Sequence, residues 1–118
     1  MDENGVCLLK NSVEQSFAEK LRSLLIFGSN SRRYKDIYDL FYLKDIVQPE
    51  KLQDIIDNLI FKDKDMREND MNDIIKRISV SFKDEQYLKR VSESRQRWID
   101  NEIHEIANGI VEYLQKIR

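Results

Sequence analysis

The chain has 118 residues, of which 36% are charged, and its formal net charge at pH 7 is only −2. This balance excludes a surface that is basic overall, so any contact with nucleic acid has to be local. Three glycines and one proline argue against a loop-rich or β-rich fold. We therefore expect one all-α domain over residues 1–118, an irregular bundle of about five to six helices.

Cysteine usage and hydropathy favour a cytoplasmic protein. The sole cysteine, Cys7, cannot form an internal disulfide, which fits a reducing compartment. The sequence holds no apolar run near the ~20 residues that a membrane span needs, and its first residues lack the pattern of a signal peptide. We expect no membrane contact.

The first predicted helix runs from Ser12 to about Phe27. Ser12 is a typical N-cap with Gln15 three residues later, and Gly28 is a typical C-terminal stop. Its apolar stripe is Val13, Phe17, Leu21 and Leu24. Before it, the apolar run over residues 6–9 fits either a short extended segment or a tail folded onto the helices.

The second predicted helix follows a short basic loop and carries two acids, Asp36 and Asp39. Residues three apart share a face of a helix but not of a strand. The apolar residues around the acids cover so much of the circumference that most of them must be buried: Tyr34, Ile37, Tyr38, Leu40, Phe41, Tyr42 and Leu43. Carboxylates beside such a surface need a cation, and Lys20 in the stripe of the first helix can supply it.

Two interpretations of Lys20 follow from this pattern. In the first, an ion pair from Lys20 to Asp36 or Asp39 fixes the register of two helices. In the second, lysine, arginine and aspartate line a groove for a phosphorylated ligand, since lysine serves as a point charge for phosphate. The candidate patch for a local contact with nucleic acid is Lys20, Arg22, Arg32, Arg33 and Lys35. The alternative is a solvated basic loop that is balanced by the acidic residues downstream.

Three further segments complete the middle of the chain. A third helix is predicted from about Glu50 to Phe61, with the core stripe Leu52, Ile55, Ile56, Leu59 and Ile60. The charged segment 62–69 indicates a solvated linker. Asp70 is a candidate N-cap for a fourth helix whose buried residues end at Ile78, and residues 78–82 indicate a helix end and connector.

From Asp84 almost to Arg118 the pattern is helical, as one helix or as two that break near residues 92–94. Isoleucines from Ile99 to Ile117 mark one apolar stripe. Trp98 is predicted to be a core anchor. His104 lies among glutamates, so we expect a solvated histidine and not a ligand or base.

The segment AEKLRSLL at residues 18–25 and the segment RRYKDIYDLFYL at residues 32–43 together resemble the C-terminal motifs of the AbiEii-type nucleotidyltransferase toxin family. In that family an AEKL helix precedes an R-x-K-D-x-x-D-L helix. The second pattern is matched at Arg33, Lys35, Asp36, Asp39 and Leu40. In looser form the resemblance continues to the C-terminus.

The resemblance implies a bacterial toxin of a toxin–antitoxin or phage-defence (abortive infection) system, a transferase that moves a nucleotide from an NTP with Mg²⁺. By the same resemblance, Lys20 contacts the nucleotide phosphates, and Arg33 and Lys35 support that charge. Asp36 or Asp39 acts as the catalytic group near the reacting hydroxyl or orients the lysines.

The sequence departs from the family at the metal-binding motif, a glycine turn followed by an Asp-x-Asp pair on a strand. After Gly28 and Ser29 the acids are three residues apart, and the preceding residues have helical periodicity. We therefore expect no metal ligands here. The chain resembles a C-terminal helical lobe without its N-terminal catalytic half, and alone it is not expected to be a competent catalyst or to hold Mg²⁺ or NTP tightly.

Three functional hypotheses remain. The first is the helical lobe of a nucleotidyltransferase toxin, whose partners are NTP, an RNA acceptor, a cognate antitoxin and the missing catalytic half. The second is a non-catalytic helical protein-interaction module whose Lys/Asp network is structural. The third is a free-standing minimal nucleotidyltransferase with a degraded motif.

Overall fold

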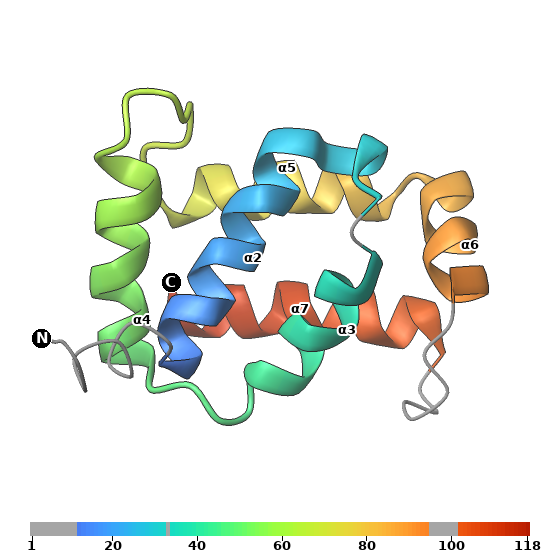
Figure 1. Ribbon diagram of the computed structural model, residues 1–118, viewed down its shortest axis with the longest axis horizontal. Coiled ribbons are helices and arrows are strands. Elements are labelled where there is room, and N and C mark those ends of the chain that lie inside the picture. The colour runs from blue at the N-terminus through green and yellow to red at the C-terminus, as the bar shows by residue number, and fades with distance from the viewer. Residues whose placement is uncertain (1–11, 33, 95–101) are drawn as a thin grey trace, which may run out of the picture.

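The computed structural model describes residues 12–32, 34–94 and 102–118, which are all-α and contain no strand (Figure 1). The elements are α2 (Val13–Phe27), the 3₁₀ turn η1 (Gly28–Asn30), α3 (Tyr34–Leu43), α4 (Pro49–Ile56), the π-helical turn η2 (Asp57–Phe61), α5 (Met71–Phe82), α6 (Glu85–Ser94) and α7 (Ile103–Ile117). The predicted all-α class is confirmed. The predictions for residues 6–9, Cys7, Arg33 and Trp98 lie outside the described residues.

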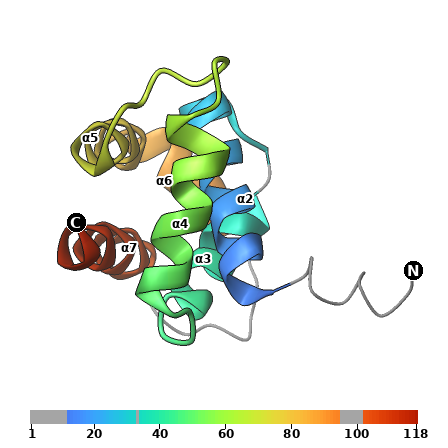
Figure 2. The same ribbon diagram turned by 90° about the vertical axis from the view of Figure 1, so that its left-hand side faces the viewer.

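The helices form two layers. Helices α5 and α7 lie side by side and run in opposite directions, while α2 and α3 cross in front of them (Figure 1, Figure 2). Helix α4 stands at one end of this arrangement and α6 at the other. None of the helices in the described ranges has the length and apolar character that a membrane span requires.

Helix α2 begins and ends where its sequence signals predict. The Gln15 amide donates a hydrogen bond to Ser12 Oγ at 3.1 Å, as in an N-cap. The Gln15 side chain donates to Glu19 at 2.9 Å, so this bond does not complete a capping box. Gly28 ends the helix with φ of 56°, a backbone region that other residues rarely adopt.

Helix α3 buries one side and exposes the other. Ile37, Tyr38 and Leu40 are buried, whereas Tyr42 is 65% exposed and is an exception within the apolar set, most of which was predicted to be buried. Positions three and seven apart lie near one another on a helix surface. Tyr42 therefore shares the outward face of α3 with Lys35 and Asp39, turned away from the core.

The third predicted helix is confirmed, and it starts at Pro49, whose ring suits a first helical turn. Its last turn, η2, widens into a π-helical turn that still buries Ile60. Helix α5 is capped by Asp70, which accepts from the Asp73 amide at 2.9 Å. Residues 78–82, predicted as a helix end and connector, form the last turn of α5, and Phe82 is buried there.

The charged segment before α5 is not wholly solvated. Glu68 is only 3% exposed, and its carboxylate lies 3.4 Å from Arg77 Nη1 on α5. Burial of a charge requires such a partner. The solvated-linker prediction is thus wrong at this residue, while most of the neighbouring charged side chains are exposed.

The C-terminal part forms two helices and not one. Glu102 has extended backbone angles and is the N-cap of α7, so the helix begins afresh after it. The predicted isoleucine stripe is confirmed for the described residues, since Ile103, Ile106, Ile110, Leu114 and Ile117 are buried. Helix α6 is held to α3 by Tyr38, whose hydroxyl donates to the Val91 carbonyl at 2.9 Å.

Candidate functional site

Lys20 on α2 meets both acids of α3. Its Nζ lies 3.3 Å from Asp36 Oδ1 and 3.2 Å from Asp39 Oδ2. The side chains differ in access to solvent: Lys20 is 24% exposed, Asp36 9% and Asp39 27%. The predicted contact between the lysine in the apolar stripe and the paired acids is therefore present in the structure.

Local helix geometry explains this contact. Lys20 lies in the stripe between Phe17 and Leu24, both buried, so its aliphatic stem packs at the edge of the core. The acids are one helical turn apart on α3, and α3 packs across α2. The ammonium group consequently sits between the two carboxylates and cannot turn freely into solvent.

The ammonium of Lys20 retains capacity to bind another acceptor. A lysine has three N–H donors, and the two carboxylates account for two of them. Beside it is a cavity of about 150 Å³ lined by Ser16, Glu19, Lys20 and Asp36. This volume is below the ~300 Å³ of small-ligand pockets, so the cavity has room for a group the size of a phosphate and not for a whole nucleotide.

The other predicted basic residues have different positions. Lys35 is exposed in the first turn of α3, and Arg32 is exposed just before that helix. Arg22 is engaged elsewhere, because its Nε donates to the Leu59 carbonyl at 3.2 Å and its Nη2 lies 2.8 Å from Asp63 Oδ2. Its guanidinium therefore joins α2 to the segment after η2.

The contacts of Asp63 change the pKa of its carboxyl. The pKa of its carboxyl is lowered by the hydrogen bond from the Asp65 amide and then by the bond from Arg22. It stays ionised, which preserves the link to α2. Arg22 is thus a structural residue, and the predicted basic patch is reduced to Lys20, Arg32 and Lys35 among the described residues.

The donor set at Lys20 suits a phosphate better than a metal ion. Magnesium requires oxygen ligands at close range, and here an ammonium group lies between the two carboxylates. Among the residues that the structure describes, no group of three His, Cys, Asp or Glu side chains could hold a metal ion. Lys20 supplies positive charge at this cavity, and the carboxylates of Asp36, Asp39 and Glu19 supply negative charge beside it.

Two residues of this cavity were not singled out in the sequence. Ser16 and Glu19 lie four and one positions before Lys20 on α2 and line its cavity. Ser16 is recognisable by its helical spacing from Lys20, which places it one turn earlier on the same face. Glu19 gave no comparable signal beyond its place in the AEKL segment.

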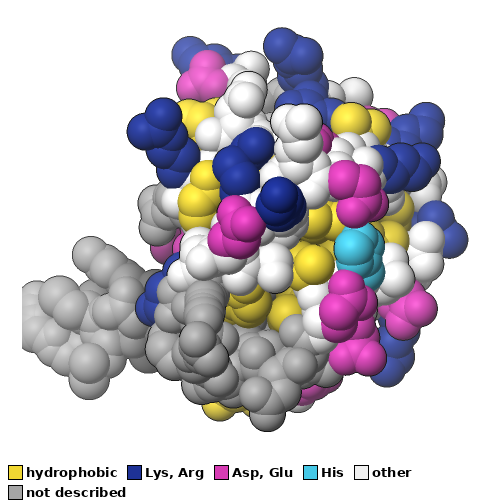
Figure 3. All heavy atoms as spheres, turned by 90° about the vertical axis from the view of Figure 1, so that its right-hand side faces the viewer, with side chains coloured by type: hydrophobic (Ala, Val, Ile, Leu, Met, Phe, Trp, Pro, Cys, Tyr) yellow, Lys and Arg dark blue, Asp and Glu magenta, His cyan; other side chains and the backbone are white. Residues whose placement is uncertain are grey.

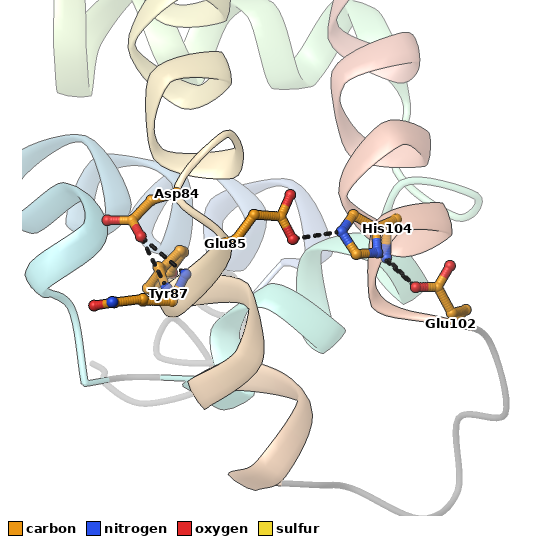
Figure 4. A network of polar contacts seen from close by, with 6 residues as sticks. Asp84, Glu85, Tyr87, Glu102 and His104 are labelled. Carbon is orange, nitrogen blue, oxygen red and sulfur yellow. Dashed lines mark hydrogen bonds and ion pairs between the residues drawn. The ribbon is translucent and has the colours of Figure 1, made fainter.

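His104 forms a second polar cluster at the junction of α6 and α7 (Figure 4). Its Nδ1 lies 2.6 Å from Glu102 Oε1, and its Nε2 lies 3.0 Å from Glu85 Oε1. Hydrogen bonds to Glu102 and then to Glu85 raise the pKa of the imidazole. The prediction of a solvent-exposed histidine is confirmed, since its side chain is 50% exposed, but its role is to join two helices.

The face that carries this histidine has mixed charge. Figure 3 shows acidic side chains beside the histidine, and lysines or arginines across the upper part of the same face and along its right-hand edge. This arrangement agrees with a net charge of only −2 and offers no continuous basic surface in this view.

Comparison with known proteins identifies the family. The model of the family described as "Nucleotidyl transferase AbiEii toxin, Type IV TA system" matches residues 11–109, which include Lys20, Asp36 and Asp39. Searches of curated proteins and of solved structures gave no match. A match over most of the chain, together with the helical pair that carries these residues, shows that the chain belongs to the AbiEii nucleotidyl transferase toxin family.

Proposed function

We propose that this chain is the helical part of a nucleotidyltransferase toxin and that Lys20 contacts the phosphates of the NTP. The observation that carries the proposal is the position of the ammonium, held by two carboxylates beside a cavity of phosphate size. A lysine fixed in this way is preorganised, so little side-chain entropy is lost when a phosphate oxygen takes its third donor.

The two acids have different roles in this proposal. Asp36 is 9% exposed, so it is a positioning residue that holds Lys20 against α3. Asp39 is 27% exposed and can also approach an acceptor hydroxyl, where a carboxylate accepts a proton or orients the attacking oxygen. Lys35, exposed in the first turn of α3, adds positive charge on the side of α3 that carries Asp39. The same supporting role for Arg33 rests on the family resemblance alone.

Magnesium, when bound, neutralises phosphate charge and keeps several of its own waters. We propose that its protein ligands lie on a catalytic half outside this chain, since Asp36 and Asp39 are engaged by Lys20. The nucleotide acceptor in this proposal is an RNA, and a cognate antitoxin is the expected protein partner of the toxin. The chain contributes the phosphate contact and the orienting carboxylates.

The test is an NMR titration of the full chain with each Mg-NTP and, separately, with inorganic tripolyphosphate. We expect amide shifts around Lys20 and Asp39 in the wild type and their loss in Lys20→Met, which keeps the length of the side chain. Lys76→Met, at an exposed position on α5, is the matched control and retains the shifts. Equal shifts in wild type and Lys20→Met, or none with any phosphate ligand, would overturn the proposal.

A second candidate function is a protein-interaction module. Its supporting observation is apolar exposure where α2 ends and on α5, with Ile26 47%, Phe27 54% and Val80 68% exposed. Light scattering of the wild type and of a Phe27→Ser, Val80→Ser variant tests whether this exposure mediates association. A monomer of unchanged mass in both would argue against self-association through these residues.

A further inference from the structure

Tyr42 is an aromatic residue that the fold leaves open to solvent. Its side chain is 65% exposed, more than that of any other described aromatic residue. It lies in the last turn of α3, one residue before the helix ends at Leu43. Leu40, two residues earlier, is fully buried. The exposure of Tyr42 follows from its position on the outward face of the helix, and the core does not depend on its ring.

Tyr42 follows, on the same helix, the acid that binds Lys20. Tyr42 follows Asp39 by three residues, which corresponds to about 4.5 Å along the axis and about 60° around it. Lys35 lies seven residues before Tyr42, about 10 Å along the axis and nearly in line with it. The outward face of α3 therefore presents, in order, an exposed cation, the carboxylate that binds Lys20, and an exposed ring.

Lys35, Lys20 and the ring match the two parts of a nucleotide, its phosphate and its base. A phosphate requires a cation, and a nucleobase offers a flat face that stacks on an aromatic side chain. A single exposed aromatic has little meaning alone, but here Lys35 lies two turns before it on the same face of α3, and Asp39, one turn before it, binds Lys20. The cavity beside Lys20 is too small for a base, which leaves the outer face of α3 as the place for it.

We infer that Tyr42 stacks on a nucleobase whose phosphate is held at Lys20. The inference rests on the proposed phosphate contact and extends it by a binding residue that no resemblance assigns. The shared ligand chemistry is a base attached to a phosphate. It has two sources, the free NTP and an unpaired base at the end of an RNA acceptor.

The experiment follows the ring signals of Tyr42 by NMR in the full chain, assigned by comparison with Tyr42→Phe. Four probes are titrated: Mg-ATP, Mg-CTP, a hexanucleotide of RNA, and tripolyphosphate, which has no base. Variants are Tyr42→Ala, which removes the ring, and Tyr42→Phe, which keeps it. Val80→Ala is the control, because Val80 is an equally exposed apolar side chain on α5.

We expect the ring signals to shift with the base-containing ligand and not with tripolyphosphate. Stacking on one base is worth about 1–3 kcal/mol, so Tyr42→Ala should weaken that ligand about tenfold. Tyr42→Phe and Val80→Ala should change its affinity by less than about twofold. A response to the mononucleotides identifies the NTP as the source of the base, and a response to the RNA alone identifies the acceptor.

The outcomes separate this inference from the proposed function. Tripolyphosphate binding that depends on Lys20, combined with unchanged nucleotide and RNA affinity in Tyr42→Ala, overturns the stacking and keeps the phosphate contact. If the wild type binds none of the phosphate-containing probes, the proposed function is overturned. An unmoved Tyr42 ring with every base-containing probe overturns the inference in either case.

Discussion

Replacement of Lys20 by methionine should destabilise the fold as well as remove a charge. The substitution keeps the apolar stem but leaves Asp36 and Asp39 facing each other without the ammonium. At 3.3 Å and an effective dielectric constant of about 20, the attraction between two unit charges is about 5 kcal/mol before desolvation is counted. Desolvation of both partners cancels most of this energy.

The solvent exposure of the Lys20–Asp36 pair determines how much its loss lowers the free energy of unfolding. Fully exposed pairs contribute about 0.2–1 kcal/mol, while loss of one partner from a buried pair costs about 3–5 kcal/mol. Lys20 and Asp36 lie between these limits, at 24% and 9% exposed. We expect Lys20→Met to lower the free energy of unfolding by about 2 kcal/mol, and the melting temperature by about 8 °C for a chain of this size.

A double-mutant cycle of Lys20→Met with Asp36→Asn isolates the first pair, and a second cycle with Asp39→Asn isolates the other. We expect a coupling energy between Lys20 and Asp36 of about 1–2 kcal/mol, and a smaller one, about 0.5 kcal/mol, between Lys20 and Asp39. The measurement is urea unfolding followed by circular dichroism, with Lys76→Met as the control. If Lys20→Met were as stable as the wild type, or if the double mutant were simply additive, the link between α2 and α3 would not be the one described.

Three further predictions concern the packing of α6 and α7. Tyr38→Phe should lower the free energy of unfolding by about 1 kcal/mol, because a buried hydroxyl no longer donates to the backbone of α6. Gly109→Ala should cost about 1 kcal/mol, since a Cβ there would lie 2.7 Å from Phe41 Cε1, and Phe41→Ala should relieve this cost. Glu85→Gln should lower the pKa of His104, measured by NMR titration of the ring.

Additional variants serve as controls for the Tyr38 and Gly109 predictions. The carbonyl that Tyr38 binds also accepts from the Ser94 hydroxyl at 2.6 Å, so Ser94→Ala combined with Tyr38→Phe should cost more than the sum of the two. A Gly109→Ala protein that is equally destabilised with and without the Phe41 ring would contradict the steric explanation.

The pH dependence of His104 has a definite sign. Its pKa in the folded chain is raised, so the stability that it contributes is fully present below its ordinary pKa and is lost as pH rises through the raised value. Wild type and Glu85→Gln should therefore differ in urea midpoint at about pH 5.5 and converge at about pH 9. A difference that is equal at both pH values would show that the imidazolium is not responsible.

Much of the fold was predictable because local signals agree with tertiary packing. Ser12, Gly28 and Asp70 each provide a helix signal that the structure uses, and the spacing of Lys20 in an apolar stripe predicted its carboxylate partners. These features depend on residues close in sequence or on the period of one helix. The same reasoning located the candidate site, although its role in NTP binding stays a prediction.

The errors arise where a residue's environment depends on distant parts of the chain. Helix α3 is apolar around most of its circumference, so periodicity could not show that Tyr42 faces outward. Arg22 finds its acceptors at Leu59 and Asp63, about forty residues later, and no local pattern indicates that contact. Glu68 looked solvated because its partner, Arg77, lies on the next helix.

The arginines that join helices limit how this protein can interact with a polyanion. Arg77 donates to the Leu25 carbonyl near the end of α2 at 2.7 Å, and Arg90 donates to the Ser29 carbonyl in η1 at 2.9 Å. Arg22 on α2 donates to the Leu59 carbonyl of η2. Guanidinium groups fixed in this way cannot wrap around a phosphate backbone. Counterion release on RNA binding would then come from about three cations, the Lys20, Arg32 and Lys35 of the basic patch. A plot of the logarithm of the association constant against the logarithm of salt concentration should therefore have a slope of only about −2.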